Sequence, residues 1–175
     1  MQVLGSSKKL DWDGVDTMQI ELQKLSVSDA QKWLELQIEA YMPLFEKYQD
    51  HETSPACETL DRIVERMGLS FLEHFFILKD DEIVGGVRTA WWPDTTRYRL
   101  GGIFILPQFQ DFGIGQIAMN LVESCYPDAT SWELDTLLQE KRNLHFYEKL
   151  GYRREGEEHV VNDRLTLVFY KKYLS

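Results

Sequence analysis

Short stretches in which apolar and polar residues alternate make up much of this chain, and they predict half-buried β-strands. The first stretch, MQIELQKL, places Met18, Ile20 and Leu22 on one side of an extended chain. Asp80 and Asp81 separate two further runs, so a tight polar turn is expected to join them as a hairpin. The expected strands are residues 18–25, 71–79, 82–92, 98–106 and 131–137, followed by a final hairpin within 152–174 that turns near 162–163.

Other stretches repeat apolar residues every three or four positions, which predicts amphipathic helices. The first of these, with Ser28 or Asp29 as N-cap, is expected to end near Pro43, because proline breaks the helical hydrogen-bond ladder. Residues 44–56 are then a loop. Gly68 and Gly151 are expected to end later helices. The expected helices are residues 30–43, 57–67, 114–124 and 141–150.

The predicted order is β-α-α-β-β-β-α-β-α-β-β, an α/β fold with a mixed, mostly antiparallel sheet and helices on its faces. The chain has 175 residues, 43% of them hydrophobic, which is enough for a substantial core. Residues 18–175 are expected to form one domain, and the polar, aperiodic residues 1–17 a flexible N-terminal arm.

Localisation and redox chemistry follow from what the sequence lacks. No apolar run approaches the roughly 20 residues that span a bilayer, and the N-terminus has no apolar signal-peptide centre. We therefore expect a cytoplasmic protein. Cys57 and Cys125 are too few for a disulfide framework and show no metal-ligand spacing with the histidines, which predicts reduced thiols and no metal site.

The formal net charge of −10 constrains the partners of the protein. It opposes contact with nucleic acid and with anionic membranes. It is compatible with a cationic small substrate, although solubility alone also explains it. The oligomeric state is left open, with a homodimer as one alternative.

The stretch QDFGIG joins the strand that ends near residue 106 to the following helix, and it is a candidate phosphate site. Glycines at 113 and 115 allow positive φ and close approach of a ligand, and the free N–H groups of a helix start attract anions. A tight strand-to-helix turn explains the same glycines, so this motif alone leaves both interpretations open.

A second motif decides between them. Gln110, Gly113 and Gly115 match the signature Gln or Arg, two residues, Gly, one residue, then Gly or Ala. About 30 residues later, HFYEKLGY at residues 145–152 matches Phe-Tyr-Glu-Lys-x-Gly-aromatic. In both motifs and in the order of its elements from Met18 onward, the chain resembles the GNAT superfamily of acetyl-coenzyme A dependent N-acetyltransferases.

The resemblance implies that acetyl-coenzyme A is the co-substrate and that no metal takes part. Amides of the loop would wrap the pyrophosphate of coenzyme A, and the preceding strand would splay from residues 132–136 to expose an edge for the pantetheine arm. Ile105 would offer its N–H to the thioester carbonyl. The implied cofactor-binding residues are Phe104, Ile105, Gln110, Asp111, Phe112, Gly113, Ile114, Gly115, Gln116 and Asn143.

Acetyl transfer requires that the acceptor ammonium loses a proton and that the leaving thiolate is stabilised. The resemblance implies that Tyr147 is the acid beside the coenzyme sulfur. By spacing alone Tyr147 is a core tyrosine of an amphipathic helix, so its assignment depends on the motif.

The general base is left unassigned. Many relatives carry a glutamate on the strand before the loop, whereas residues 98–102, YRLGG, contain no carboxylate. The polar residues on strands that border the expected acceptor site are Glu73, His74, Glu133 and Asp135, each also explained as an outward-facing strand residue. A chain of water molecules is an alternative.

The family's usual asparagine seven residues before the tyrosine is Glu140 here. Asn143, about one helical turn later, is expected to replace it or to help start the helix. Lys141 and Arg142 are candidate partners for a coenzyme phosphate, with solvated surface charge as the alternative.

The sequence does not identify the acceptor molecule. Of the adjacent Trp91 and Trp92, one is expected in the core and the other lines a pocket or packs on the opposite face of the sheet. Few arginines occur near the expected acceptor site, which favours an amine over an anionic acceptor.

The sequence therefore predicts an N-acetyltransferase that acetylates a primary amine of a small molecule or peptide by direct attack in a ternary complex. The alternative is a non-catalytic acetyl-coenzyme A sensor or interaction domain, which the missing strand carboxylate keeps open. A plain α/β fold whose glycines only form a turn predicts no stabilisation by coenzyme A.

Overall fold

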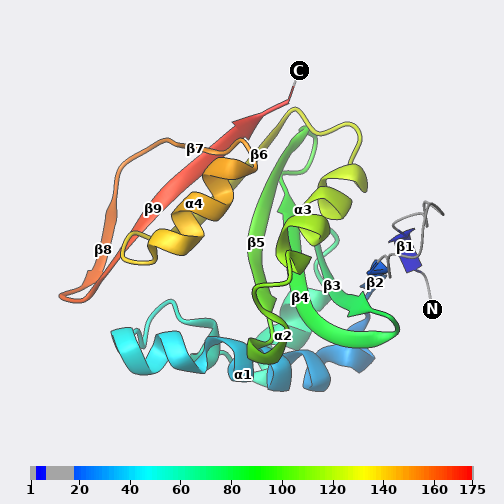
Figure 1. Ribbon diagram of the computed structural model, residues 1–175, viewed down its shortest axis with the longest axis horizontal. Helices are drawn as coiled ribbons and strands as arrows, with labels where there is room; N and C mark the ends of the chain where they lie inside the picture. Colours follow the sequence, from blue (N-terminus) through cyan, green and yellow to red (C-terminus); the bar gives the residue numbers. More distant parts are fainter. Residues whose placement is uncertain (1–2, 7–17, 175) are drawn as a thin grey trace.

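The structure, a computed structural model, describes residues 3–6 and 18–174. The strands are β1 (Val3–Ser6), β2 (Ile20–Lys24), β3 (Leu72–Lys79), β4 (Glu82–Trp91), β5 (Arg97–Ile105), β6 (Ser131–Leu137), β7 (Arg153–Arg154), β8 (His159–Asn162) and β9 (Leu165–Tyr173). The helices are α1 (Ala30–Tyr48), α2 (Leu60–Met67), α3 (Ile114–Ser124) and α4 (Lys141–Lys149). Across these residues the strands form one sheet in the order β1-β2-β3-β4-β5-β6-β9-β7, with β8 paired to β9 (Figure 1). The α/β fold is confirmed.

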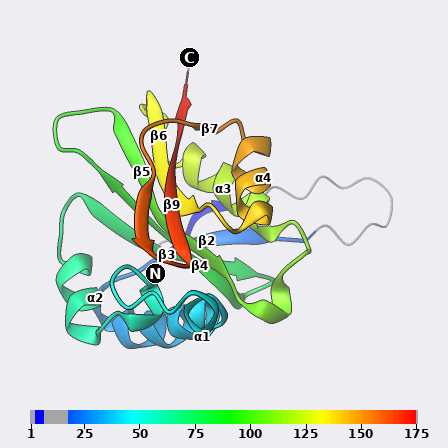
Figure 2. The ribbon, with the colours of Figure 1, turned by 90° about the vertical axis from the view of Figure 1, so that its left-hand side faces the viewer.

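The sheet separates two layers of helices (Figure 2). Helices α3 and α4 pack on one face and α1 and α2 on the other. Phe75 and Ile77 of β3 belong to the first core, whereas Phe76 and Leu78 belong to the second, because successive strand residues face opposite sides. No helix in the described parts of the chain is both long and apolar enough to cross a bilayer.

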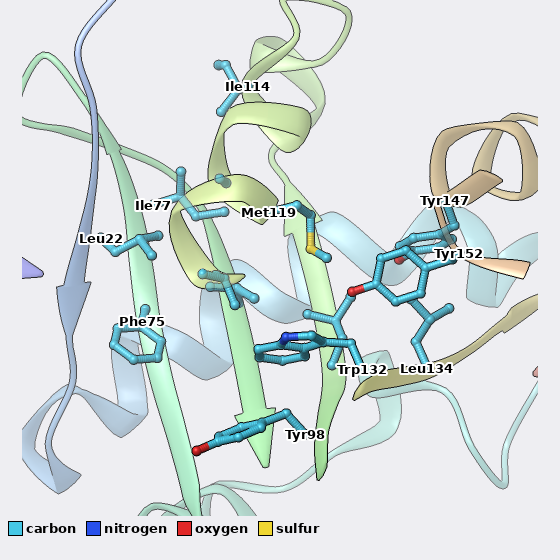
Figure 3. Packing of buried hydrophobic residues seen from close by; sticks show 14 of the residues in the cluster. Leu22, Phe75, Ile77, Tyr98, Ile114, Met119, Trp132, Leu134, Tyr147 and Tyr152 are labelled. Atoms are coloured by element: carbon cyan, nitrogen blue, oxygen red, sulfur yellow. The ribbon is translucent and has the colours of Figure 1, made fainter. Parts of the chain in front are cut away.

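Aliphatic and aromatic side chains together fill the core beneath α3 and α4 (Figure 3). The rings of Tyr98 and Trp132 lie with their centroids 5.3 Å apart, so they join β5 to β6. Tyr147 and Tyr152 lie next to each other at the edge of this core, with centroids 6.1 Å apart. The side chain of Tyr147 is therefore held by packing before any ligand binds.

Helix α1 does not end near Pro43 as predicted but continues to Tyr48, and Gln49 ends it with a left-handed φ of 52°. Proline removes one helical hydrogen bond, but the second half of the helix gains tertiary contacts that offset this cost. Tyr48 is buried, and its hydroxyl donates to Glu140. Part of the predicted 44–56 loop is consequently helical.

Helix α2 begins three residues later than predicted. Thr59 caps it by accepting a hydrogen bond from the N–H of Arg62 at 3.4 Å. The preceding residues Pro55–Cys57 form a short 3-10 turn. Cys57, where the predicted helix began, is therefore exposed on a turn and lies outside α2.

Four residues within the expected N-terminal arm, residues 1–17, lie in a strand. Val3–Ser6 forms β1, which pairs antiparallel with β2. An unpaired strand edge offers N–H and C=O groups to any extended segment nearby, and β2 supplies such an edge. Residues 1–2 and 7–17, and thus the rest of the expected arm, lie outside the described residues.

His74 on β3 is a buried imidazole whose two nitrogens find no hydrogen-bond partner among the described residues. It lies edge-on to the indole of Trp33, with ring centroids 4.7 Å apart. Burial, and then the charges of Arg88 and Arg66, lower the pKa of His74 from 6.5 to about 3. The folded protein therefore keeps His74 neutral in mildly acidic solution.

We expect the free energy of unfolding to fall as the pH drops below about 6.5, because the unfolded chain then binds a proton at His74 that the folded chain does not. This pKa shift does not affect the free energy of unfolding above that pH, and it lowers the free energy progressively below it, by about 2 kcal/mol at pH 5. Urea unfolding at pH 7 and pH 5 measures the loss, and His74→Phe should remove it. His159→Phe, at an exposed position on β8, should retain the wild-type pH dependence. A His74→Phe protein with unchanged pH dependence would contradict this account.

Candidate active site

The loop between β5 and α3 presents a row of unused backbone donors. The N–H groups of residues 111–115 make no hydrogen bond to any acceptor in the described segments. Asp111 and Gly113 both have positive φ, 70° and 76°, and Gly113 is the N-cap of α3. Consecutive free amides in such a turn, at the positive end of a helix, form a site for an anion such as phosphate.

This row of free amides is shorter than the predicted binding stretch, which runs from Gln110 to Gln116. The N–H of Gln116 donates to the carbonyl of Gly113 at 3.1 Å, and that of Gln110 donates to Pro107 at 3.4 Å. Gln110 contributes through its side chain instead, because its Nε2 donates to the carbonyl of Ile105 at 3.0 Å. The glutamine of the motif thus fastens the loop to the end of β5.

Strands β5 and β6 pair only at their beginnings, where Arg97–Arg99 face Ser131–Glu133. Beyond this point the two strands diverge toward α1 (Figure 1). The expected splay is therefore present, although Trp132 is still paired. The N–H of Leu106 donates to Val84 on β4 at 2.9 Å, so the alternation of the strand turns the N–H of Ile105 toward the split. The edge proposed to receive the pantetheine arm is thus open.

A cavity of about 610 Å³ runs between this edge, the loop and α4. It is called the larger cavity below, because a second, smaller one adjoins it. Its lining includes every predicted cofactor-binding residue except Phe112: Phe104, Ile105, Gln110, Asp111, Gly113, Ile114, Gly115, Gln116 and Asn143. Phe112 is 62% exposed, and its ring lies 6.0 Å from the Nζ atom of Lys79. The side chain of Phe112 is therefore outside this cavity, while its backbone remains in the row of free amides.

Tyr147 lies where the larger cavity meets a second one. It belongs to α4, is 8% exposed, and lines both cavities. Burial, and to a lesser extent the neighbouring Tyr41 and Asp135, raise the pKa of Tyr147 above its ordinary value. Its hydroxyl is therefore protonated at neutral pH and acts as a hydrogen-bond donor.

The start of α4 is tied to the end of α1. Glu140 accepts hydrogen bonds from the Nζ atom of Lys47 at 2.7 Å and from the Tyr48 hydroxyl. Glu140, at the family's asparagine position, therefore holds two helices together, and it lines the larger cavity but not the smaller one described below. Asn143 lines both cavities, which supports it as the replacement.

Arg142 and Asp111 form an ion pair across the larger cavity, with Nη2 and Oδ1 2.5 Å apart. Both side chains are mostly exposed, so the pair contributes little to stability. It does place a guanidinium beside the row of free amides. Lys141, the other predicted phosphate partner, is exposed and is not part of the cavity lining.

The second, smaller cavity has a volume of about 280 Å³ and lies on the other side of Tyr147. Five lining residues are common to both cavities: Tyr41, Leu44, Ile103, Asn143 and Tyr147. The polar and charged residues found only in the smaller one are Tyr48, Asp50, Thr53, Ser54, Arg88, Arg99, Asp135 and Thr136. The two cavities thus meet at a short junction around Tyr147.

Of the four candidate bases, Asp135 lines the smaller cavity, and the other three line neither of the two cavities. Glu73 pairs with Lys24 and accepts from the Tyr126 hydroxyl, away from both cavities. His74 is enclosed in the core, and Glu133 lies 3.5 Å from Arg99 without lining either cavity.

The sequence profile of the acetyltransferase (GNAT) family matches residues 30–152, well over half of the chain. This chain belongs to the GNAT family of acetyltransferases. A curated relative is the uncharacterized protein YrkN of Bacillus subtilis (strain 168), which is 35% identical over 79 residues. That alignment covers 45% of this GNAT chain and 43% of the relative.

Solved structures agree with the GNAT fold. An acetyltransferase from Thermus thermophilus has a TM-score of 0.69 at 16% identity, covering 89% of this chain and 97% of that one. The PaiA N-acetyltransferase of Thermoplasma acidophilum, in complex with coenzyme A, gives 0.69 and 15%, covering 89% and 99%. The Salmonella typhimurium acetyltransferase that modifies the N-terminal serine of ribosomal protein L7/L12 gives 0.71 and 17%, covering 93% and 98%. At these identities the likeness concerns the fold.

Several residues of this GNAT site were not predicted. Tyr41 falls within the helix predicted for residues 30–43 and was given no role in the site, yet its hydroxyl donates to the carbonyl of Ile103 at 3.1 Å on the open edge. Arg88 and Arg99 become neighbours of one cavity through the antiparallel pairing of β4 with β5. Trp91 packs in the core, whereas Trp92 follows the end of β4 and lies under the Arg97 guanidinium. Neither tryptophan lines the two cavities.

Proposed function

We propose that this protein transfers the acetyl group of acetyl-coenzyme A to a primary amine of a small molecule or peptide, within a ternary complex. The observation that carries the proposal is the row of free amides at residues 111–115, which opens into a cavity that ends at Tyr147. Family membership supports the reaction class. Structural neighbours described as acetylating an N-terminal serine or spermidine support an amine acceptor.

Coenzyme A would occupy the larger cavity. The free amides and Arg142 would hold its diphosphate, and the open edge of β5 would bind the pantetheine arm as an added strand does. The N–H of Ile105 would point at the thioester carbonyl and stabilise the negative charge that develops on its oxygen during attack. The side chain of Gln110 supports this orientation of the Ile105 N–H, because it already donates a hydrogen bond to the backbone carbonyl of Ile105.

Tyr147 would stabilise the leaving sulfur. A thiolate with a pKa near 8.5 is a weaker base than a tyrosinate whose pKa is raised above about 10. Full proton transfer from Tyr147 is therefore uphill, and a hydrogen bond to the sulfur is the favoured interaction. Tyr147 would thus act as a hydrogen-bond donor to the sulfur, and not as the full proton donor expected from the sequence.

The acceptor would enter through the smaller cavity. Its amine is mostly an ammonium at neutral pH and must lose a proton before it attacks. Two carboxylates line this cavity. Asp50 accepts hydrogen bonds from the N–H groups of its own loop, whereas Asp135 lies near Tyr147 and would attract the ammonium, with water as the route for the proton. Cys57 and Cys125 line neither cavity, which supports direct attack without an acyl-enzyme.

The test is the rate at which coenzyme A is released from acetyl-coenzyme A in the presence of a panel of primary amines. The proposal predicts that the release of coenzyme A depends on the amine. Double-reciprocal plots of the initial rate against substrate concentration should give intersecting lines, as in a ternary-complex mechanism. Tight binding of coenzyme A with no transfer to any amine would instead identify a sensor. Parallel lines would indicate a covalent acetyl-protein.

Asp111→Asn is expected to tighten the binding of coenzyme A. It removes a carboxylate from the phosphate site and releases Arg142, and asparagine tolerates the positive φ of this position. Removal of one unit charge near the surface changes the free energy of coenzyme A binding by on the order of 1 kcal/mol. The dissociation constant should therefore fall about fivefold at low salt.

Calorimetric titration with coenzyme A at low and high salt checks this expectation, because the gain should shrink as salt screens the charge. Asp94→Asn is the matched control. Asp94 is also exposed and has a φ of 61°, but it lies in the turn between β4 and β5. Weaker binding by Asp111→Asn would contradict the placement of the diphosphate.

A further inference from the structure

The smaller cavity contains a guanidinium that the protein itself does not fully use. Arg88 on β4 is mostly buried, with 18% of its side chain exposed, and it lines this cavity. Its Nη2 donates to the carbonyl of Gly101 at 2.8 Å. Its Nε and Nη1 atoms donate no hydrogen bond to any residue in the described segments. A buried cation with open donors is costly unless another group completes it.

The nearest carboxylate does not fill this gap. Glu58 lies 3.8 Å from Nη1 of Arg88, beyond hydrogen-bond distance. Its carboxylate is already engaged by the guanidinium of Arg66 and by Nε2 of Gln37 at 2.8 Å. Burial accordingly lowers the pKa of Arg88 from its ordinary value.

The other arginine of the smaller cavity is differently engaged. Arg99 forms an ion pair with Asp135 and lies 3.5 Å from Glu133. Its charge is therefore balanced within the protein, and the two carboxylates with one guanidinium keep a net negative charge. Arg88 is left as the guanidinium with open donors for a ligand. Its Nη1, together with the second N–H of Nη2, forms a planar fork that matches a carboxylate.

The same cavity also has a negative end. Asp135 lies close enough to Tyr41 and Tyr147 to contribute to the raised pKa values of both hydroxyls. Both tyrosines stand at the junction of the two cavities, where an acceptor amine must attack. With about 280 Å³, the cavity is at the small end of ligand pockets, which suits a metabolite-sized acceptor.

We infer that the acceptor is a small amino acid-like molecule, whose amine faces Tyr147 and Asp135 while its carboxylate binds Arg88. This inference rests on the proposed function and specifies its substrate class. It also revises the expectation that few arginines disfavour an acceptor with an anionic group. The two arginines are eleven positions apart in the sequence, and only the pairing of β4 with β5 brings both to the cavity.

The experiment compares amino acids with their carboxamides as acetyl acceptors. Glycine, β-alanine and γ-aminobutyrate, each with its amide, vary the distance between amine and carboxylate while the amide removes only the charge. We expect kcat/KM for the best acid to exceed that of its amide by tenfold to a hundredfold, as for a hydrogen-bonded charge pair of about 1.5–3 kcal/mol. Arg88→Gln should abolish this preference, and Arg88→Lys should retain part of it.

Arg97→Gln is the matched control, because Arg97 is exposed and stacks on Trp92 outside both cavities. It should keep the preference for the acid. Melting temperatures and coenzyme A binding report whether each variant is folded. If Arg88→Gln does not fold, Arg88→Lys and the wild-type acid-to-amide ratio decide the question.

Two results separate this inference from the proposed function. Transfer to amines with no preference for the acid would overturn the inference and leave the transferase intact. If no acetyl transfer is found, titration calorimetry measures the binding of the amino acids to coenzyme A-loaded protein. Binding that depends on Arg88 without any transfer would support the inference and overturn the transferase. Equal binding of acid and amide, without transfer, would overturn both.

Discussion

Gly113→Val is expected to weaken the binding of coenzyme A by more than a hundredfold. Gly113 has a φ of 76°, and an added side chain would stand in the row of amides that faces the ligand. The loss of two hydrogen bonds to a charged phosphate, at about 1.5–3 kcal/mol each, accounts for a change of this size. Titration calorimetry with coenzyme A measures it.

The control must carry the same backbone strain without touching the ligand. Gly156 has a φ of 98° and lies between β7 and β8, away from both cavities. Gly156→Val should lose a similar amount of stability, about 1–2 kcal/mol, and keep its affinity for coenzyme A. If Gly113→Val binds coenzyme A as the wild type does, the diphosphate does not lie on this loop.

Tyr147→Phe is expected to reduce kcat about a hundredfold and to leave coenzyme A binding nearly unchanged. The ring would keep its packing against Phe146 and Tyr152. The hydroxyl makes no hydrogen bond with any described residue, so its removal leaves no buried partner unsatisfied. What is lost is the donor to the leaving sulfur, and single donors of this kind contribute factors of about 10²–10³.

Steady-state kinetics with the best acceptor, together with a melting curve, test this expectation. Tyr173→Phe is the control, because its exposed hydroxyl contacts only Glu155 among the described residues. It should retain full activity. Equal kcat values for Tyr147→Phe and wild type would mean that the thiolate leaves without help from this tyrosine.

Most of the fold follows from local patterns of hydrophobicity. Strand β6 and helix α3 lie where alternation and helical spacing predict them, and Gly151 ends α4 with a left-handed φ of 92°. The end of α1 does not follow from local pattern, because the contact of Tyr48 with Glu140 offsets the cost of Pro43. That contact joins residues 92 positions apart, and no local pattern contains it.

The donor half of the site is similarly local, whereas the acceptor half is not. The free amides belong to one loop and one helix start, so a short motif describes them. The smaller cavity combines Arg88 from β4, Arg99 from β5 and Asp135 from β6. Each alone has the pattern of an outward-facing strand residue, and only the divergence of β5 from β6 turns these positions toward a common space.

The most direct test of the account is transfer of an isotopically labelled acetyl group. The protein is incubated with acetyl-coenzyme A labelled in the acetyl carbons and with the panel of amines and amino acids, and the products are identified by mass spectrometry. The account predicts labelled acetyl on the acceptor nitrogen and none on the protein. Binding of coenzyme A with no labelled acceptor, or label found on the protein itself, would contradict it.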